Sequence, residues 1–145
     1  MPKAVIDQIN IVAGDMRKSA DFYRRLGIDI EEPGADAFHV GGEAAGGFAV
    51  DLDTAKFAQV WNAAWKGRAD LVGRVVIGFA VETRDDVDKT FKEMTAAGYK
   101  GLAAPWDAFW GSRYAMLEDP NGIAVGIMSP ADPSRRFWPP EGWEG

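Results

Sequence analysis

The stretch that decides the fold reads Val5-Ile6-Asp7-Gln8-Ile9-Asn10-Ile11-Val12-Ala13-Gly14-Asp15. From Gln8 to Ile11 isoleucines alternate with polar residues, which is the period of a half-buried β-strand. Asp15 then provides an N-cap, and apolar residues recur at helical spacing up to Leu26. Gly27 stands where a glycine commonly ends a helix. The sequence therefore predicts a strand followed by an amphipathic helix over residues 15–26.

Shorter elements are predicted in the rest of the first half. Apolar runs at 28–30, 37–40 and 48–52 indicate three strands, and the glycine-rich residues 41–47 indicate a hairpin loop between the last two. A face at i, i+3, i+4, i+7 and i+8 that carries Trp61 and Trp65 predicts a connector helix, capped by Asp53 or Thr54. Such a tryptophan pair is typical of a core or a subunit interface, and less often of a ligand pocket.

The opening pattern returns in the second half, where Val76 takes the place of Gln8. An apolar strand at 75–81 is followed by Thr83 and Asp86, which resemble a capping box with Asp in place of Glu, and by a helix that ends at Gly98. Three strands are expected around 99–102, 113–117 and 123–128, the last two joined by the turn Asp119-Pro120-Asn121-Gly122. The order strand, helix and three strands, found twice, predicts an α+β fold of two βαβββ modules.

Composition narrows the classes of function. The chain has 145 residues, a formal charge of −6, no cysteine and one histidine, His39. These counts exclude disulfides, zinc ribbons, iron–sulfur clusters, thiol nucleophiles and any site that needs two histidines from one chain. The acidic balance argues against nucleic acid and anionic membranes as partners. No apolar run is long enough to span a bilayer and no signal-peptide pattern is present, so we expect a cytoplasmic protein.

Two segments, 14–27 and 110–122, carry a recognisable pattern. They read Gly14-Asp15-Met16-Arg17-Lys18-Ser19-Ala20-Asp21-Phe22-Tyr23-Arg24-Arg25-Leu26-Gly27 and Trp110-Gly111-Ser112-Arg113-Tyr114-Ala115-Met116-Leu117-Glu118-Asp119-Pro120-Asn121-Gly122. Each in its own half, they resemble the vicinal-oxygen-chelate superfamily of glyoxalase I, bleomycin-resistance proteins and extradiol dioxygenases.

The resemblance covers roughly residues 3–129, and it implies one domain over residues 1–129. It implies two tandem βαβββ modules, about 3–53 and 73–129, joined by a connector helix over about 54–67. Their curved mixed sheets would form a shared cleft, with the helices on the convex faces. Residues 130–145 form a tail rich in proline and aromatic residues. This tail is either a surface segment pinned by its aromatic groups, or an arm that closes the pocket or packs on a second subunit.

The resemblance also implies four metal-ligand positions. They fall on Gln8, Asp51, Val76 and Gly126. The first two are oxygen donors, whereas valine and glycine side chains offer no donor. Two oxygen donors from one module bind a divalent transition metal poorly. We therefore expect neither a metal nor a cofactor.

His39 is the remaining candidate for chemistry. Strand alternation turns it toward the cleft, and the expected hairpin register places it near Ala49 with Asp51 diagonal to it. A His39–Asp51 pair could act as a general base, or could complete a metal site with Gln8. Alternatively, a local hydrogen bond holds His39 and it has no chemical role.

The inner face of the second module is expected to be small and apolar, which suits a small organic ligand. Trp106 and Trp110, expected in the loop before the second motif, could form aromatic walls or belong to the core. Arg113 could pair with Glu118 or Asp107, or contact an acidic ligand. The predicted ligand-binding residues are Gln8, Asn10, His39, Asp51, Val76, Gly78, Trp106, Trp110, Arg113 and Gly126.

Three functions are compatible with this sequence. The first is a metal-free protein of the bleomycin-resistance kind that binds a small aromatic or amphipathic organic molecule in the cleft between the two modules. The second is an enzyme, a lyase, isomerase or oxygenase that uses His39, Asp51 and Gln8 with or without a divalent metal. The third is an interaction module, favoured by the tail and the Trp61–Trp65 pair. The resemblance implies a homodimer in each case.

Overall fold

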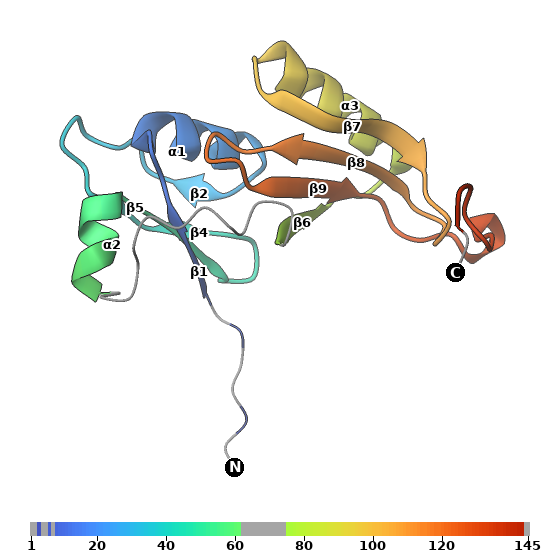
Figure 1. Ribbon diagram of the computed structural model, residues 1–145, viewed down its shortest axis with the longest axis horizontal. Coiled ribbons are helices and arrows are strands. Elements are labelled where there is room, and N and C mark those ends of the chain that lie inside the picture. The colour runs from blue at the N-terminus through green and yellow to red at the C-terminus, as the bar shows by residue number, and fades with distance from the viewer. Residues whose placement is uncertain (1–2, 4–5, 7, 62–74, 144–145) are drawn as a thin grey trace. The chain divides into compact units, whose positions relative to one another are not determined.

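The computed structural model describes residues 3, 6, 8–61 and 75–143 of the chain (Figure 1). Contacts divide the chain into two compact units, Met1–Asp70 and Leu71–Gly145, and each is described by itself. Both combine helices with a mixed sheet, so the predicted α+β class is confirmed. Within the described part of the chain, no helix has the length and apolar character needed to cross a membrane.

The first unit is a mixed five-stranded sheet with helix α1 against it. Strands β1 and β5 pair in parallel, and the sheet runs β1-β5-β4-β2, with β3 also paired to β5. Its elements are β1 (Gln8–Val12), α1 (Met16–Arg25), β2 (Asp29–Ile30), β3 (His39–Val40), β4 (Gly42–Glu43), β5 (Ala49–Asp53) and α2 (Ala55–Trp61). Strand β4 was not predicted, because its glycine-rich surroundings are typical of a loop.

Local sequence explains α1 and the face that it buries. The Asp15 side chain caps the helix by accepting a hydrogen bond from the Lys18 amide at 3.0 Å. Helix α1 contacts β5, and Phe22, Tyr23 and Leu52 are fully buried. Burial of each such side chain stabilises the fold by roughly 1.5–3 kcal/mol. The polar residues of β1 lie on the opposite face of the sheet, as their alternation predicted.

The second unit repeats the arrangement with a four-stranded sheet in the order β6-β9-β8-β7, in which β6 and β9 are parallel. Its elements are β6 (Val76–Ala80), α3 (Arg84–Ala96), β7 (Lys100–Asp107), β8 (Arg113–Glu118), β9 (Ala124–Met128) and the 3₁₀ turn η1 (Pro133–Arg135). Strand β7 is longer than predicted and reaches Asp107. Trp106 therefore lies in a strand, and the prediction that it lies in a loop is wrong.

Helix α3 covers one face of this sheet and contacts β7, β8 and β9. The predicted capping box is confirmed, since the Thr83 hydroxyl accepts from the Asp86 amide and the Asp86 carboxylate accepts from the Thr83 amide, each at 3.1 Å. Phe91 packs on β7 so closely that a Cβ at Gly101 would lie 2.6 Å from its ring. Glycine at this position therefore lets the helix approach the strand.

The predicted boundaries between modules, connector and tail stay predictions. Helix α2 occupies the first part of the expected connector helix, and the rest of that helix, including Trp65, lies outside the described residues. The described part of the tail, residues 130–143, belongs to the second unit by its contacts.

Candidate functional site

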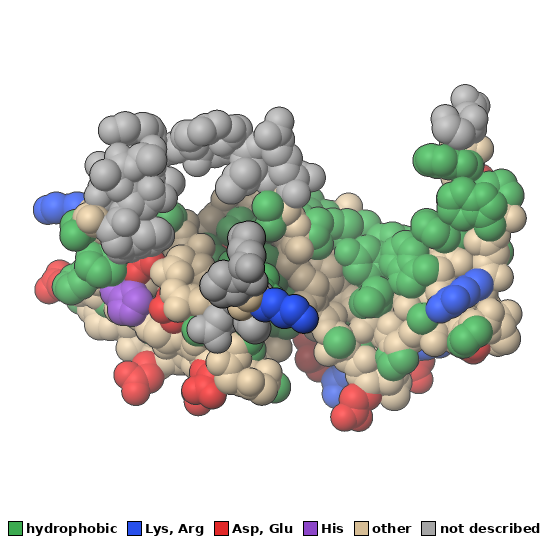
Figure 2. Space-filling model, turned by 90° about the horizontal axis from the view of Figure 1, so that it is seen from below, with side chains coloured by type: hydrophobic (Ala, Val, Ile, Leu, Met, Phe, Trp, Pro, Cys, Tyr) green, Lys and Arg blue, Asp and Glu red, His purple; other side chains and the backbone are tan. Residues whose placement is uncertain are grey.

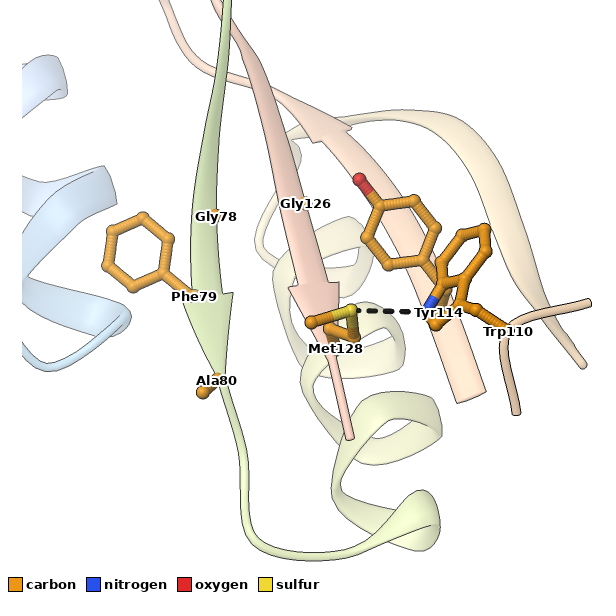
Figure 3. Close-up of a pocket in the computed structure, with 7 residues that line it drawn as sticks. All are labelled: Gly78, Phe79, Ala80, Trp110, Tyr114, Gly126 and Met128. Carbon is orange, nitrogen blue, oxygen red and sulfur yellow. Dashed lines mark hydrogen bonds between the residues drawn. The ribbon is translucent and has the colours of Figure 1, made fainter. Parts of the chain in front are cut away.

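The second unit carries a hollow of about 330 Å³. In β8, Arg113 pairs with Asp88 of α3, so the next side chain, Tyr114, points to the opposite face of the sheet. The hollow therefore lies on the face turned away from α3. It is lined by Gly78, Phe79, Ala80, Trp110, Tyr114, Gly126 and Met128 (Figure 3).

The Tyr114 ring lies directly over Gly126. A Cβ built on Gly126 would lie 2.8 Å from Tyr114 Cε2 and 2.9 Å from Cζ, and would also meet the hydroxyl oxygen. The ring thus fills the space that any side chain at position 126 would need. Sequence reasoning singled out Gly126 but missed Tyr114, because only the β8–β9 register places the two together.

Two tryptophans hold this tyrosine. Its ring centroid lies 4.9 Å from that of Trp106 and 5.3 Å from that of Trp110, both edge-on. The Trp110 indole N–H also donates to the Met128 sulfur at 3.3 Å (Figure 3). Trp110 therefore forms a wall of the pocket, whereas Trp106 supports Tyr114.

Several large apolar side chains of this unit are exposed to solvent. Val76, Leu102, Trp106 and Met128 are exposed hydrophobic residues. Figure 2 shows a broad hydrophobic area, coloured green, over the part of the molecule formed by the second unit. Gly78 lies on β6 opposite Gly126, and nothing lies within 4 Å of where its Cβ would be. Glycine at position 78 therefore leaves the β6 part of the pocket floor open, whereas the Tyr114 ring covers Gly126.

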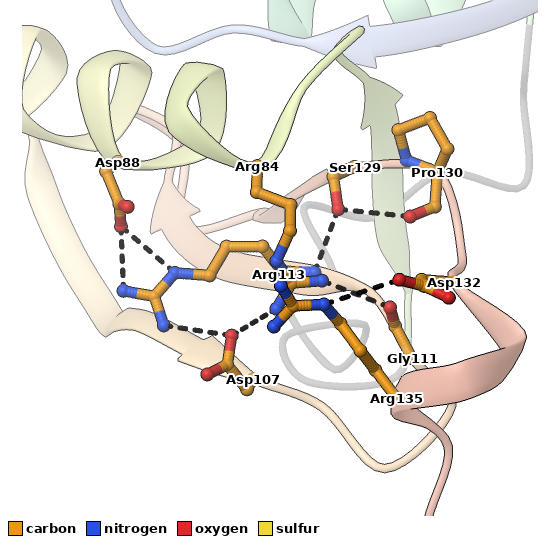
Figure 4. A network of polar contacts seen from close by, with 9 residues as sticks. All are labelled: Arg84, Asp88, Asp107, Gly111, Arg113, Ser129, Pro130, Asp132 and Arg135. Atoms are coloured by element: carbon orange, nitrogen blue, oxygen red, sulfur yellow. Dashed lines mark hydrogen bonds and ion pairs between the residues drawn. The ribbon is translucent and has the colours of Figure 1, made fainter.

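Arg113 belongs to an ion-pair network on the α3 side of the sheet (Figure 4). It lies 2.9 Å from Asp88 and 3.2 Å from Asp107, which also pairs with Arg84. Although burial alone would raise the pKa of Asp107, the hydrogen bonds from Arg84 and Arg113 hold it below the usual value of 3.8. The hydrogen bond to Asp88 in turn raises the pKa of Arg113. Arg113 thus forms ion pairs with these carboxylates and does not line the pocket.

Of the two partners predicted for Arg113, only Asp107 is confirmed. Glu118 instead lies 3.5 Å from Lys100, its cross-strand neighbour.

The first unit carries a chain of polar side chains on the face opposite α1. The Gln8 amide donates to Asn10, and the Asn10 amide donates to Asp53 Oδ2 at 2.8 Å. Nδ1 of His39 lies 2.6 Å from the other oxygen, Asp53 Oδ1. The Asp53 side chain is only 1% exposed, whereas that of His39 is 40% exposed. Figure 2 shows the imidazole, coloured purple, at the surface.

The predicted pairing of His39 with Asp51 is wrong. The β3–β5 register places His39 opposite Asp53, two residues further along the strand. The Asp51 carboxylate instead accepts a long hydrogen bond of 3.4 Å from the Gly42 amide. The additional strand β4 pairs with the start of β5, and this moves β3 toward the end of β5. Sequence reasoning took Asp53 as a helix cap and so missed its place beside His39.

The match to a family model covers residues 5–127 and is to the Glyoxalase/Bleomycin resistance protein/Dioxygenase superfamily. The chain belongs to this superfamily. The predicted resemblance is therefore confirmed. No curated protein matches the chain.

Solved structures of similar fold include other superfamily members. A hypothetical protein, SA1046 from S. aureus, is 25% identical, with 90% of this chain and 95% of that one covered and a TM-score of 0.69. A superfamily enzyme from Burkholderia phytofirmans PsJN is 21% identical, with 87% and 98% covered and a TM-score of 0.70. The antibiotic binding protein TnmS3 from Streptomyces sp. CB03234 is 20% identical, with 90% and 99% covered and a TM-score of 0.61.

The residues at the four positions that the resemblance assigns to metal ligands do not fit a metal ion. At the two positions in the second unit, Val76 presents only hydrocarbon and the Tyr114 ring covers Gly126. In the first unit these positions hold Gln8 and Asp51, whose two oxygen donors are too few to bind a divalent metal ion well. Among residues 8–61 and 75–143, no three His, Asp or Glu side chains are grouped as a metal site would require.

Proposed function

We propose that this chain binds a small aromatic or amphipathic organic molecule, without a metal, in the pocket of the second unit. The observation that carries the proposal is the Tyr114 ring over Gly126, held between Trp106 and Trp110, where a metal-dependent member would need a ligand. Aromatic faces and edges in an apolar hollow favour a flat, uncharged molecule. A volume of about 330 Å³ is at the lower end of the range for organic ligand pockets.

The chemistry of the lining narrows the ligand further. None of the seven lining residues is charged, so burial of a charged ligand group here would be costly. The Tyr114 hydroxyl has no hydrogen-bond partner within the part of the chain that the structure describes, so it is free to bond one polar atom of a ligand. TnmS3, a structural neighbour, is described as an antibiotic binding protein, which supports a binding role for this fold.

The test is a titration with N-phenyl-1-naphthylamine, an uncharged aromatic dye that fluoresces in apolar surroundings. We expect the wild-type protein to bind it, and Trp110→Ala to raise the Kd roughly three- to tenfold through loss of an aromatic wall. The matched control is Phe38→Ala, which removes an exposed aromatic residue of the first unit. Absence of dye binding by the wild type, or equal loss in the control, would overturn the proposal.

The metal-free part of the proposal has its own measurement. Added Ni²⁺, Zn²⁺, Mn²⁺ or Fe²⁺ is expected to leave Tm unchanged, because a bound metal would raise it. A metal-dependent rise in Tm would contradict this part alone.

A second candidate function is an isomerase or lyase that uses His39 as a general base. The Asn10–Asp53–His39 chain favours it, because a buried carboxylate that accepts from Nδ1–H leaves Nε2 free to take a proton. The test is NMR of α-proton exchange in a panel of ketones in D₂O. Exchange should be lost in His39→Gln and kept in Asp51→Asn. Equal exchange in wild type and His39→Gln would exclude this candidate.

The homodimer and the cytoplasmic location also remain proposals. Sedimentation equilibrium would test the first, with twice the monomer mass as the expected result.

A further inference from the structure

We propose that the C-terminal segment, defined here as residues 129–143, holds Trp110 in place as a wall of the ligand pocket. The family match ends at residue 127, so this segment lies beyond it. The consequence for ligand affinity rests on the proposed binding function, whereas the effect on Trp110 does not.

Hydrogen bonds tie the segment to the loop that carries Trp110. The Asp132 amide donates to the Gly111 carbonyl at 3.0 Å, and the Phe137 amide donates to the Phe109 carbonyl at 3.0 Å. Between them, Arg136 Nε donates to the Trp110 carbonyl at 3.1 Å. Three consecutive carbonyls of the loop therefore accept hydrogen bonds from one short stretch of the segment.

The segment also lies unusually close to this loop. Gly111 has φ +97°, a conformation that L-residues rarely adopt. A Cβ at Gly111 would meet the Asp132 carbonyl oxygen and would lie 3.2 Å from Arg136 Cγ. Glycine at this position is therefore what allows the segment to seat against the loop.

Aromatic side chains extend the same support to the indole. The Phe109 ring lies edge-on to Trp110 at 5.1 Å and edge-on to Trp138 at 5.4 Å. Trp138 in turn contacts Trp143 at 5.6 Å. Trp138 thus supports Phe109, and Phe109 supports Trp110.

The physical consequence is preorganisation of the pocket. Trp110 lies in the loop between β7 and β8, and such loops are among the more mobile parts of a protein. If the Trp110 side chain becomes ordered only on binding, the lost conformational entropy weakens ligand affinity. If it is already ordered in the free protein, this loss does not occur on binding. Arg136 and Trp138 are therefore positioning residues, which act through Trp110 and do not line the pocket themselves.

The test uses the full-length chain and compares two adjacent arginines. Arg136→Ala is expected to raise the Kd for N-phenyl-1-naphthylamine about fivefold, which corresponds to one hydrogen bond of ordinary strength. Trp138→Ala should raise it by a similar factor. The matched control is Arg135→Ala, because Arg135 pairs with Asp132 at 3.4 Å and makes no hydrogen bond to the loop. Arg136→Lys, which keeps a donor, should recover part of the affinity.

A second measurement follows Trp110 without any ligand. In protein labelled with 5-fluorotryptophan, the ¹⁹F resonance of Trp110 is assigned by its loss in Trp110→Phe. This resonance is expected to shift and broaden in Arg136→Ala and Trp138→Ala, and to stay unchanged in Arg135→Ala. A purely structural role would instead lower Tm and leave the resonance in place.

The outcomes separate this inference from the proposed function. If Trp110→Ala weakens dye binding while Arg136→Ala and Trp138→Ala change neither the Kd nor the ¹⁹F resonance, the inference is overturned and the binding function stands. If the wild type binds no dye, the binding function fails. The ¹⁹F resonance then decides alone whether the segment positions Trp110.

Discussion

Gly126→Ala is expected to destabilise the second unit by about 1–3 kcal/mol, the usual cost of overpacking a filled site. The added methyl group would lie 2.8 Å from Tyr114 Cε2 and 2.9 Å from Cζ, well inside van der Waals contact. Tyr114 cannot move away freely, because its ring packs edge-on against Trp106 and Trp110.

A double-mutant cycle isolates this contact. Gly126→Ala in a Tyr114→Ala background should cost less than about 0.5 kcal/mol, because no ring remains to meet the methyl group. The matched control is Gly78→Ala on the neighbouring strand, where nothing lies within 4 Å of the new Cβ. That substitution should be neutral or slightly stabilising, since it reduces the freedom of the unfolded chain.

The assay is urea unfolding followed by circular dichroism, with dye binding as the functional readout. Gly126→Ala should also weaken dye binding, because the displaced Tyr114 ring moves into the pocket or away from Trp110. Equal destabilisation by Gly126→Ala and Gly78→Ala, or an unchanged cost of Gly126→Ala without Tyr114, would refute the packing argument.

Three further predictions concern other parts of the chain. Asp53→Ala should lower the free energy of unfolding in urea by about 2 kcal/mol, because it leaves two donors without an acceptor. Asp51→Ala loses one long hydrogen bond and should lower it by under about 1 kcal/mol. Equal losses in the two variants would contradict the assigned register. The pKa of Asp107 is lower in the folded protein, so its contribution to stability is present above about pH 4 and is lost as pH falls through the lowered pKa. Asp107→Asn should therefore reduce the acid-induced loss of stability, by under about 1 kcal/mol because Asp107 is largely exposed. If the free energy of unfolding depends on pH in the same way in the variant and the wild type, the ion-pair network does not stabilise the fold. Thr83→Ala should destabilise the second unit by about 1 kcal/mol through loss of the helix cap, with Thr83→Ser retaining most of it in the same assay.

The sequence predicted most of the fold because its signals are local. Alternation around Gln8 and Asn10, the cap at Asp15 and the capping box at Thr83 each depend on residues within one turn or strand. Strand β4 and the second half of β7 were missed. Strand β4 is rich in glycine, and the second half of β7 lacks a regular alternation of apolar and polar residues. Both segments are extended because they pair with a neighbouring strand.

The candidate site was predicted only in part, because local sequence does not determine how strands pair. Trp110 was identified by its position in a motif, and the lack of donors at Val76 and Gly126 follows from residue identity alone. Tyr114 was missed, and Asp53 was assigned a different role. The positions of both depend on strand register, and a shift of two residues changes the partner without changing the face.

The sequence by itself determined which kinds of site the chain cannot form, such as disulfides or sites with two histidines, and it determined the repeated strand–helix plan. Residue types and short-range periodicity do not depend on the rest of the chain. Only the tertiary structure decided which side chains meet. It placed Tyr114 over Gly126, paired His39 with Asp53, and set Arg136 against the loop of Trp110. These contacts join residues far apart in sequence, and they follow from strand register and packing of the whole unit.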